Sequence, residues 1–127
     1  MRKSWAIAVM AISTLVSPLD SARARPAWRM PVGTCWVTRV KVVETRLEGV
    51  ADSGSAIEYV DGNVQTSYEA VRGIDHSRKG DRVRLCIAEL PRDCPPGDHR
   101  GVVFRAVNLR TREHWKEQDY EHGCGGA

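Results

Sequence analysis

The chain has 127 residues, with 19 Lys and Arg against 16 Asp and Glu and a formal net charge of +3. Without the charged residues of an N-terminal export signal (Arg2, Lys3, Arg23 and Asp20), 16 basic and 15 acidic side chains remain. This near balance excludes a nucleic-acid-binding protein that relies on bulk positive charge, and the length predicts one small domain.

The first 24 residues have the pattern of a secretory signal peptide. A basic start, MRKSW, precedes the apolar run AIAVMAISTLV, and Ala22-Arg23-Ala24 places small residues two apart. The apolar run is too short to cross a bilayer, which needs about 20 residues. We expect cleavage after Ala24, a single small β domain over residues 25–127, and a periplasmic or secreted location. The alternative is an uncleaved membrane anchor.

Alternating patterns predict the first three strands. In residues 35–47, one face carries Trp36, Thr38, Val40 and Val42, and Val43 then breaks the alternation, which predicts a β-bulge or the approach of a bend. Asp61-Gly62 predicts a hairpin turn between residues 55–60 and 64–68. The apolar side chains of this hairpin are Ile57, Tyr59, Val64 and Tyr68. Residues 67–73 could instead form a short helix capped by Ser67 and closed by Gly73.

The second half of the chain predicts further strands. Residues 80–90 alternate apolar and basic side chains, and residues 101–115 form two strands around a turn at 108–111. About five or six short strands with little helix indicate an all-β fold, a small antiparallel β-barrel or rolled sheet. An OB-like order, with three strands, a short helical link and two strands, is the first choice. Disulfides would staple this fold.

Four cysteines remain after export, and an even number in an exported domain predicts two disulfides. If the last hairpin turns near Leu109, Cys94 and Cys124 meet at its open end. Pro96-Gly97 then suits the centre of a type II turn. Cys35 and Cys86 both fall on the polar side of their strands and form the second pair. The rival is a Cys86–Cys94 bridge.

The same strand parity predicts a basic outer face. Antiparallel pairing of residues 35–47 with 80–90 brings together the candidate partner-binding residues. These are Arg39, Lys41, Arg82 and Arg84, with Arg78 and Lys79 in the adjoining turn. A bound anion would offset the repulsion between these charges. The alternative is a solvated face that is balanced by Glu48, Glu58 or Glu89.

Metal and catalytic sites are not predicted. Zinc-ligand types occur at Cys86, Cys94, Cys124, His99, His114 and His122, but without C-x2-C or H-x3-H spacing and in a compartment that oxidises thiols. Asp75-His76-Ser77 has the residue types of a hydrolase triad, which three consecutive residues cannot assemble. Glu113 and Glu117 could form a carboxylate pair, but we interpret them as solvated residues at the end of a strand. We expect no cofactor, no metal and no enzymatic activity.

The segment CPPGDHRGVVFRAVNLRT through HGCGGA resembles small exported four-cysteine proteins of alphaproteobacteria. This resemblance extends over most of the mature chain and implies export and disulfides, without a function. A second resemblance is to periplasmic inhibitors of c-type lysozyme, small disulfide-bonded β-barrels with a serine-rich SG loop and a later Lys-Gly turn. It rests on DSGSAIEY (Ser53, Gly54, Ser55) and RKGD (Arg78, Lys79, Gly80), although the spacing is longer and the early Y-x-C is absent. The alternative is two ordinary polar turns.

Two functions are therefore carried forward. The first is an exported, non-catalytic binding module for a protein partner, such as an inhibitor. The second is a module that binds an anionic envelope polymer or glycan through the basic strand face. Their salt dependence separates them, because a polyanion releases counterions when it binds.

Overall fold

A computed structural model describes residues 25–126, so the predicted signal peptide lies outside the described residues. Its elements in chain order are the 3-10 helix η1 (Ala27–Arg29), β1 (Cys35–Thr45), β2 (Ser55–Tyr59), β3 (Val64–Ser67), α1 (Arg72–Asp75), β4 (Arg82–Glu89), β5 (Val103–Asn108) and β6 (His114–Gln118). Within this part of the chain, no helix has the length and apolar character needed to cross a membrane. The all-β prediction is confirmed.

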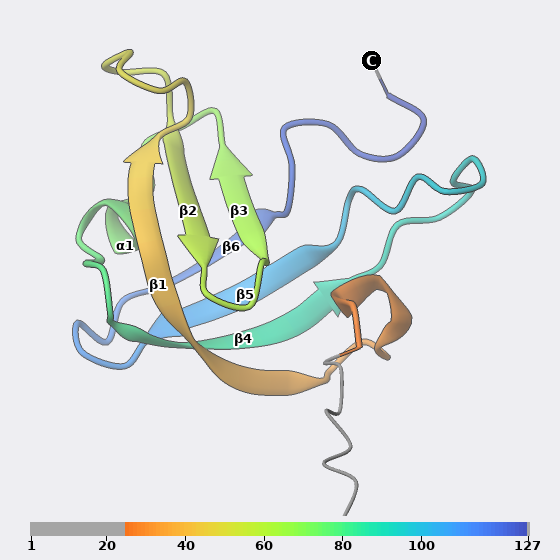
Figure 1. The fold of residues 1–127 in the computed structure, drawn as a ribbon, viewed down its shortest axis with the longest axis horizontal. Coiled ribbons are helices and arrows are strands. Elements are labelled where there is room, and N and C mark those ends of the chain that lie inside the picture. Colours follow the sequence, from red (N-terminus) through yellow and green to blue (C-terminus); the bar gives the residue numbers. More distant parts are fainter. Residues whose placement is uncertain (1–24, 127) are drawn as a thin grey trace, which may run out of the picture.

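The six strands close into an antiparallel barrel in the order β1-β2-β3-β6-β5-β4 (Figure 1). A short helical link follows the first three strands, as the OB-like order predicts. Three strands follow the link instead of two, because residues 82–118 supply β4, β5 and β6. Strand β1 pairs with both β2 and β4, and one residue pair, Thr66 with Gln118, joins β3 to β6.

Strand β1 is longer than its neighbours and changes partner along its length. Cys35 to Arg39 pair with β4, whereas Val40 to Thr45 pair with β2. The register shifts between Val40 and Val42, so the strand has an irregularity as predicted, but it comes before Val42 and not at Val43. The bend lets β1 run first along β4 and then along β2 (Figure 1).

The β2–β3 hairpin turns at Asp61-Gly62 as predicted, but the second strand faces the other way. Tyr68 is 52% exposed, and Gln65 is fully buried instead. The Gln65 side-chain carbonyl accepts hydrogen bonds from the Tyr59 hydroxyl (2.7 Å) and from Trp115 Nε1 (2.9 Å). Its amide nitrogen donates to the main-chain oxygens of Phe104 and Glu117. One glutamine thus connects β2, β3, β5 and β6 at the closure of the barrel, where a single residue pair joins β3 to β6.

The helix lies later than the alternative Ser67–Gly73 reading placed it. Ser67 ends β3, and Gly73 lies inside α1. A Cβ atom at Gly73 would stand 2.4 Å from Trp115 Cε3, so only glycine permits the helix to pack against this indole. The glycine therefore serves close packing and does not end the helix.

The last hairpin also turns slightly later than predicted. The Asn108 amide donates to Glu113 O, and the Arg112 amide donates to Asn108 O. The turn is therefore centred between Arg110 and Thr111, not at Leu109. The Asn108 side-chain oxygen accepts the amides of Arg110 and Thr111, which stabilises this longer turn.

Candidate functional site

Both predicted disulfides are present, Cys35–Cys86 and Cys94–Cys124, and the rival Cys86–Cys94 bridge is wrong. Cys35 and Cys86 face each other directly in the β1–β4 ladder, as strand parity predicts. Cys94 and Cys124 lie in segments outside the strands. They can therefore pair although the last hairpin is centred later than predicted.

The loop after β4 is a turn held by an ion pair. The Asp98 amide donates to Pro95 O, and Gly97 has φ of 83°, which fits the predicted type II turn. Arg100 donates two hydrogen bonds to the Asp98 carboxylate, which also accepts the Gly125 amide (3.0 Å). The Arg100 hydrogen bonds and the Gly125 amide hold the pKa of Asp98 well below its usual range. Asp98 thereby ties this loop to the C-terminal tail.

The strand register brings the predicted cations together on one outer surface. Arg39 pairs directly with Arg82, Arg84 lies opposite Val37, and Arg105 joins from β5 by pairing with Cys86. Arg39 Nη1 donates to Gly80 O, which holds the turn before β4 beside β1. We call this surface the basic face; its members are Arg39, Arg78, Lys79, Arg82, Arg84 and Arg105, all exposed.

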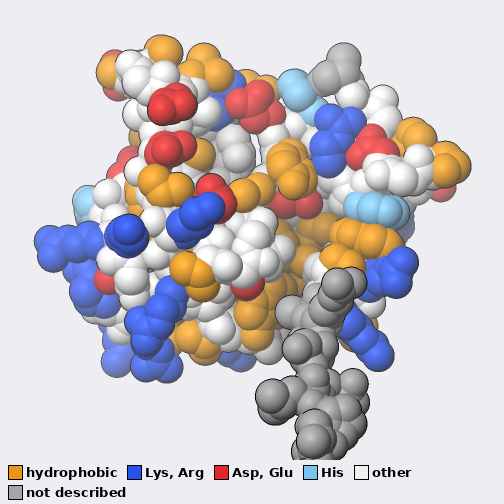
Figure 2. Space-filling model, in the orientation of Figure 1, with side chains coloured by type: hydrophobic (Ala, Val, Ile, Leu, Met, Phe, Trp, Pro, Cys, Tyr) orange, Lys and Arg blue, Asp and Glu red, His pale blue; other side chains and the backbone are white. Residues whose placement is uncertain are grey.

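Acidic residues neutralise the borders of the basic face but not its members. Glu58 pairs with Lys41 (2.6 Å), and Glu89 pairs with Lys116 (3.6 Å). Within residues 25–126, no ion pair joins a member of the basic face or Glu48 to a partner. Figure 2 shows Lys and Arg side chains gathered over the region where β1 meets β4 in Figure 1. Lys41 is thus the predicted member whose charge is already offset.

A large cleft opens at the mouth of the barrel, beside the first half of β1. Its volume is about 1580 Å³, and apolar side chains lie within the hollow in Figure 2. The segments that line it are residues 25–30, the first half of β1 with Thr34, the β2–β3 turn, residues 97–102, Arg82 and the pair Asp119-Tyr120. It exceeds the 300–1,000 Å³ usual for small-molecule pockets, so it suits part of a larger ligand.

Aromatic side chains form much of the cleft wall. The rings of Trp28 and His99 stack with their centroids 3.6 Å apart, and the Arg29 guanidinium lies 4.6 Å from the Trp28 ring. Trp36 packs edge-on against buried Phe104. The Trp28–His99 stack joins the N-terminal segment to the β4–β5 loop, and the Trp36–Phe104 contact joins β1 to β5.

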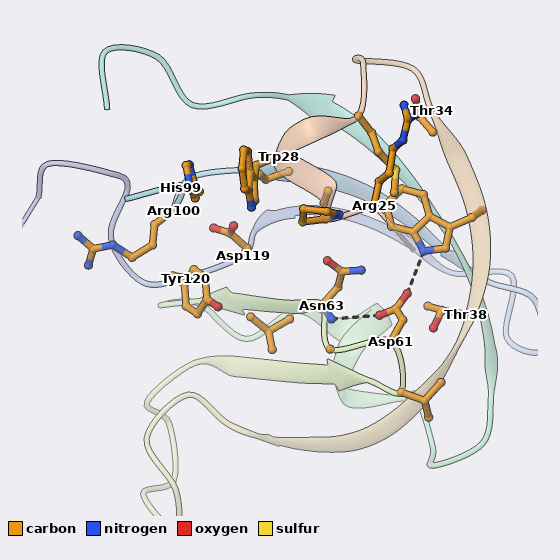
Figure 3. Close-up of a pocket in the computed structure, with 18 of the residues that line it drawn as sticks. Arg25, Trp28, Thr34, Thr38, Asp61, Asn63, His99, Arg100, Asp119 and Tyr120 are labelled. Carbon is orange, nitrogen blue, oxygen red and sulfur yellow. Dashed lines mark hydrogen bonds between the residues drawn. The ribbon is translucent and has the colours of Figure 1, made fainter. Parts of the chain in front are cut away.

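Polar groups enter the cleft from two opposite sides (Figure 3). On one side, the Asp61 carboxylate accepts hydrogen bonds from Trp36 Nε1 (2.9 Å) and from the main-chain N–H of Asn63 (3.0 Å). On the other, buried Asp119 accepts the Gly101 amide (2.8 Å), and burial raises the pKa of this carboxyl. Thr38 is 7% exposed, and its hydroxyl has no hydrogen-bond partner among the described residues.

The candidate metal ligands do not come together. All four cysteines are in disulfides, His99 stacks on Trp28, and His114 and His122 lie on β6 and in the tail. Over residues 25–126, no cluster of three or more His, Cys, Asp or Glu has an arrangement suited to a metal ion.

The Asp75-His76-Ser77 side chains point to separate partners. Asp75 accepts the Ser55 hydroxyl, His76 Nδ1 meets the Glu113 carboxylate at 2.9 Å, and the Ser77 hydroxyl donates to Gly73 O. Glu117, the other predicted carboxylate of this strand end, has its pKa raised by burial. These contacts stabilise α1 and its neighbours and form no Asp–His–Ser relay.

The two elements that carry the resemblance to lysozyme inhibitors are both local turns. The Ser53 hydroxyl bonds to Val50 O and the Leu47 amide, and Ser55 is buried. In the second turn, the Gly80 amide donates to Val40 O. Comparison of the chain with protein-family models, with curated proteins and with solved structures finds no match.

Sequence patterns identified the basic face but missed the cleft. The cleft is assembled from segments far apart in the chain, and its signals were apolar or aromatic residues at strand ends. Val37 on the polar side of its strand and Val60 beside the turn are 48% and 63% exposed. Both were available in the sequence as apolar side chains at positions expected to face solvent.

Proposed function

We propose that this protein is an exported, non-catalytic binding module that engages an anionic polymer through the basic face. The observation that carries the proposal is the group of six exposed cations without an acidic partner in the described chain. The two disulfides are consistent with a location outside the reducing cytosol.

The strand register supports a bound anion. Arg39 and Arg82 are direct cross-strand partners, and like charges in that position destabilise a sheet. A sulfate or phosphate group between the two guanidinium groups would offset this repulsion through charge-assisted hydrogen bonds. The pair is thus a natural centre for an anion site.

The breadth of the basic face favours a polymer over a single small anion. Its strand members lie on β1, β4 and β5, and adjacent strands are about 4.8 Å apart. A chain of regularly spaced sulfates or phosphates can contact several of these cations at once. A single anion would leave most of them unpaired.

Matched charge reversals test this function with heparin as a sulfated probe and polyphosphate as a phosphorylated one. Arg84→Glu reverses a charge on β4, the middle strand of the face, and Arg92→Glu makes the same charge change at an exposed loop residue outside it. We expect R84E to weaken binding at least about tenfold and to lower the salt slope by about 1, with R92E near the wild type. Equal losses in the two variants, or binding that is insensitive to salt, would contradict the proposal.

A further inference from the structure

The first half of β1 has one unpaired edge. Cys35 to Arg39 pair with β4 on one side, and on the other the β2–β3 hairpin ends at Arg39, where the Val60 amide donates to Arg39 O (3.0 Å). Before Arg39, β1 has no strand partner on this side within residues 25–126. This edge borders the cleft, which Trp36, Val37 and Thr38 line.

Strand alternation identifies the main-chain groups on this edge. Thr34 O accepts from Ile87 N, and the Val40 amide donates to Asp81 O, so even-numbered residues direct their main chain toward β4. The main-chain N–H and C=O of Cys35 and Val37 therefore point to the opposite edge. No hydrogen bond joins the Val37 main chain to another described residue on that side. Such unpaired edges are templates for an added strand.

The cleft supplies two further requirements for a peptide ligand. Its volume of about 1580 Å³ accommodates several residues of an extended chain. Val37 and Val60 remain largely exposed beside it, although burial of such side chains is favourable. The buried Thr38 hydroxyl, unpartnered in the described chain, is a polar group that a ligand in the cleft would satisfy.

We propose that an extended segment of a partner protein, with alternating acidic and apolar residues, adds to this edge of β1 as a further strand. Peptide residues opposite Trp36 would direct apolar side chains into the cleft, toward this indole. A residue opposite Val37 would face outward, diagonal to Arg39, where a carboxylate meets the border of the basic face. Main-chain hydrogen bonds to Cys35 and Val37 would provide the affinity, and the alternation of acidic and apolar side chains in the peptide would provide the specificity.

This ligand is distinct from the polymer of the proposed function, and the inference does not rest on that function. The polymer would lie on outward-facing side chains of β1, β4 and β5. The peptide would bind the main-chain edge and the cleft and would share only the border of the basic face at Arg39 and Arg82, so main-chain protection and N-methylation test it apart from the polymer.

The test uses the exported, oxidised protein and capped nonapeptides of alternating Val and Glu. The matched probes are a Val/Lys peptide and two Val/Glu peptides that are N-methylated on opposite edges. We expect the Val/Glu peptide to slow amide exchange at Cys35 and Val37 at least tenfold and to bind at least tenfold more tightly than the Val/Lys peptide. N-methylation of only one edge should abolish binding, because only one edge faces β1.

Two variants and a polymer control complete the test. Val37→Pro removes the free amide at an edge position, where proline is tolerated, and Arg92→Glu is the folded control. We expect V37P to keep both disulfides and heparin binding but to lose peptide binding, with R92E unchanged. The inference is overturned if both N-methylated peptides bind equally well, or if the Val/Glu peptide slows amide exchange at sites other than Cys35 and Val37. It is also overturned if heparin slows exchange of these two amides, or if the protein forms a dimer that pairs through this edge.

Discussion

The two halves of β1 have opposite main-chain environments. From Val40 onward β1 lies against β2, near a core that Tyr59, Gln65 and Trp115 connect by buried hydrogen bonds. From Cys35 to Thr38 it has β4 on one side and the cleft on the other. One strand thus has its partner on opposite edges in its two halves, and the free edge of the first half borders the cleft.

The two halves of β1 should therefore respond differently to substitution, one in stability and the other in binding. Substitutions in the closed part remove satisfied buried groups, so they should lower the free energy of unfolding. Substitutions at the open part change exposed or unpartnered groups, so they should alter binding with little loss of stability. The following predictions test this contrast in order of decreasing effect.

Gln65→Leu should have the largest effect. It leaves the Tyr59 hydroxyl, Trp115 Nε1 and two main-chain oxygens without their partner. We expect a loss of about 3–5 kcal/mol in the free energy of unfolding, from denaturant titration. The control Thr66→Val, on the neighbouring side chain of β3, should stay within about 0.5 kcal/mol of the wild type. A loss below about 1 kcal/mol in Q65L would show that the barrel closes without this glutamine.

Removal of either disulfide should cost about 2–4 kcal/mol, but with different local consequences. Cys94→Ala with Cys124→Ala releases the loop and the tail beside the cleft, so exchange of the Gly101 amide and of the main-chain amide at position 124 should rise. Cys35→Ala with Cys86→Ala should leave those two amides protected. Equal exchange in the two double variants, measured by hydrogen–deuterium exchange, would remove this distinction.

Asp81→Asn should cost about 2 kcal/mol near neutral pH, because a charged acceptor of several hydrogen bonds is lost. Asp81 accepts two bonds from Arg110 and one from Asn108, and these bonds hold its pKa well below the usual range. A carboxyl with a lowered folded-state pKa stabilises the fold above its unfolded pKa of about 3.9 and loses this contribution as the pH falls.

Unfolding midpoints measured from neutral to acidic pH test this linkage. The gap between the wild type and D81N should be full above about pH 4 and should shrink below it. The exposed control Asp93→Asn should follow the wild type at every pH. A gap that is constant through the acid range would contradict the assignment.

Thr38→Val should have the smallest effect and the opposite sign. Replacing a buried hydroxyl that has no partner in the described chain should raise stability by about 1 kcal/mol. The same change should weaken binding of the Val/Glu peptide if the ligand satisfies this hydroxyl. A clear loss of stability in T38V would mean that the hydroxyl already has a partner.

Sequence parity predicted features that depend on alternation alone. It placed Cys35 opposite Cys86 and gathered Arg39, Arg82 and Arg84, because side-chain direction in a strand repeats every two residues. The same alternation wrongly placed Tyr68 on the buried side of β3 and did not identify Gln65 as buried. A buried glutamine needs hydrogen-bond partners, and those of Gln65 come from β5 and β6, which are distant in the sequence. The cleft was missed because the edge of β1 is defined by where the β2–β3 hairpin ends, which no local pattern encodes.

Amide hydrogen exchange along β1 in the free protein shows directly whether the first half of this strand has an unpaired edge. We expect fast exchange for Cys35 and Val37, whose amides face the cleft, and slow exchange for Trp36 and Thr38, whose amides face β4. After Val42, β2 is the only strand beside β1 among the described residues, so alternation should continue there, with slow exchange at the amides that face β2. Slow exchange at Val37, equal to that at Thr38 in the ligand-free monomer, would show that the edge is already paired and would contradict the account.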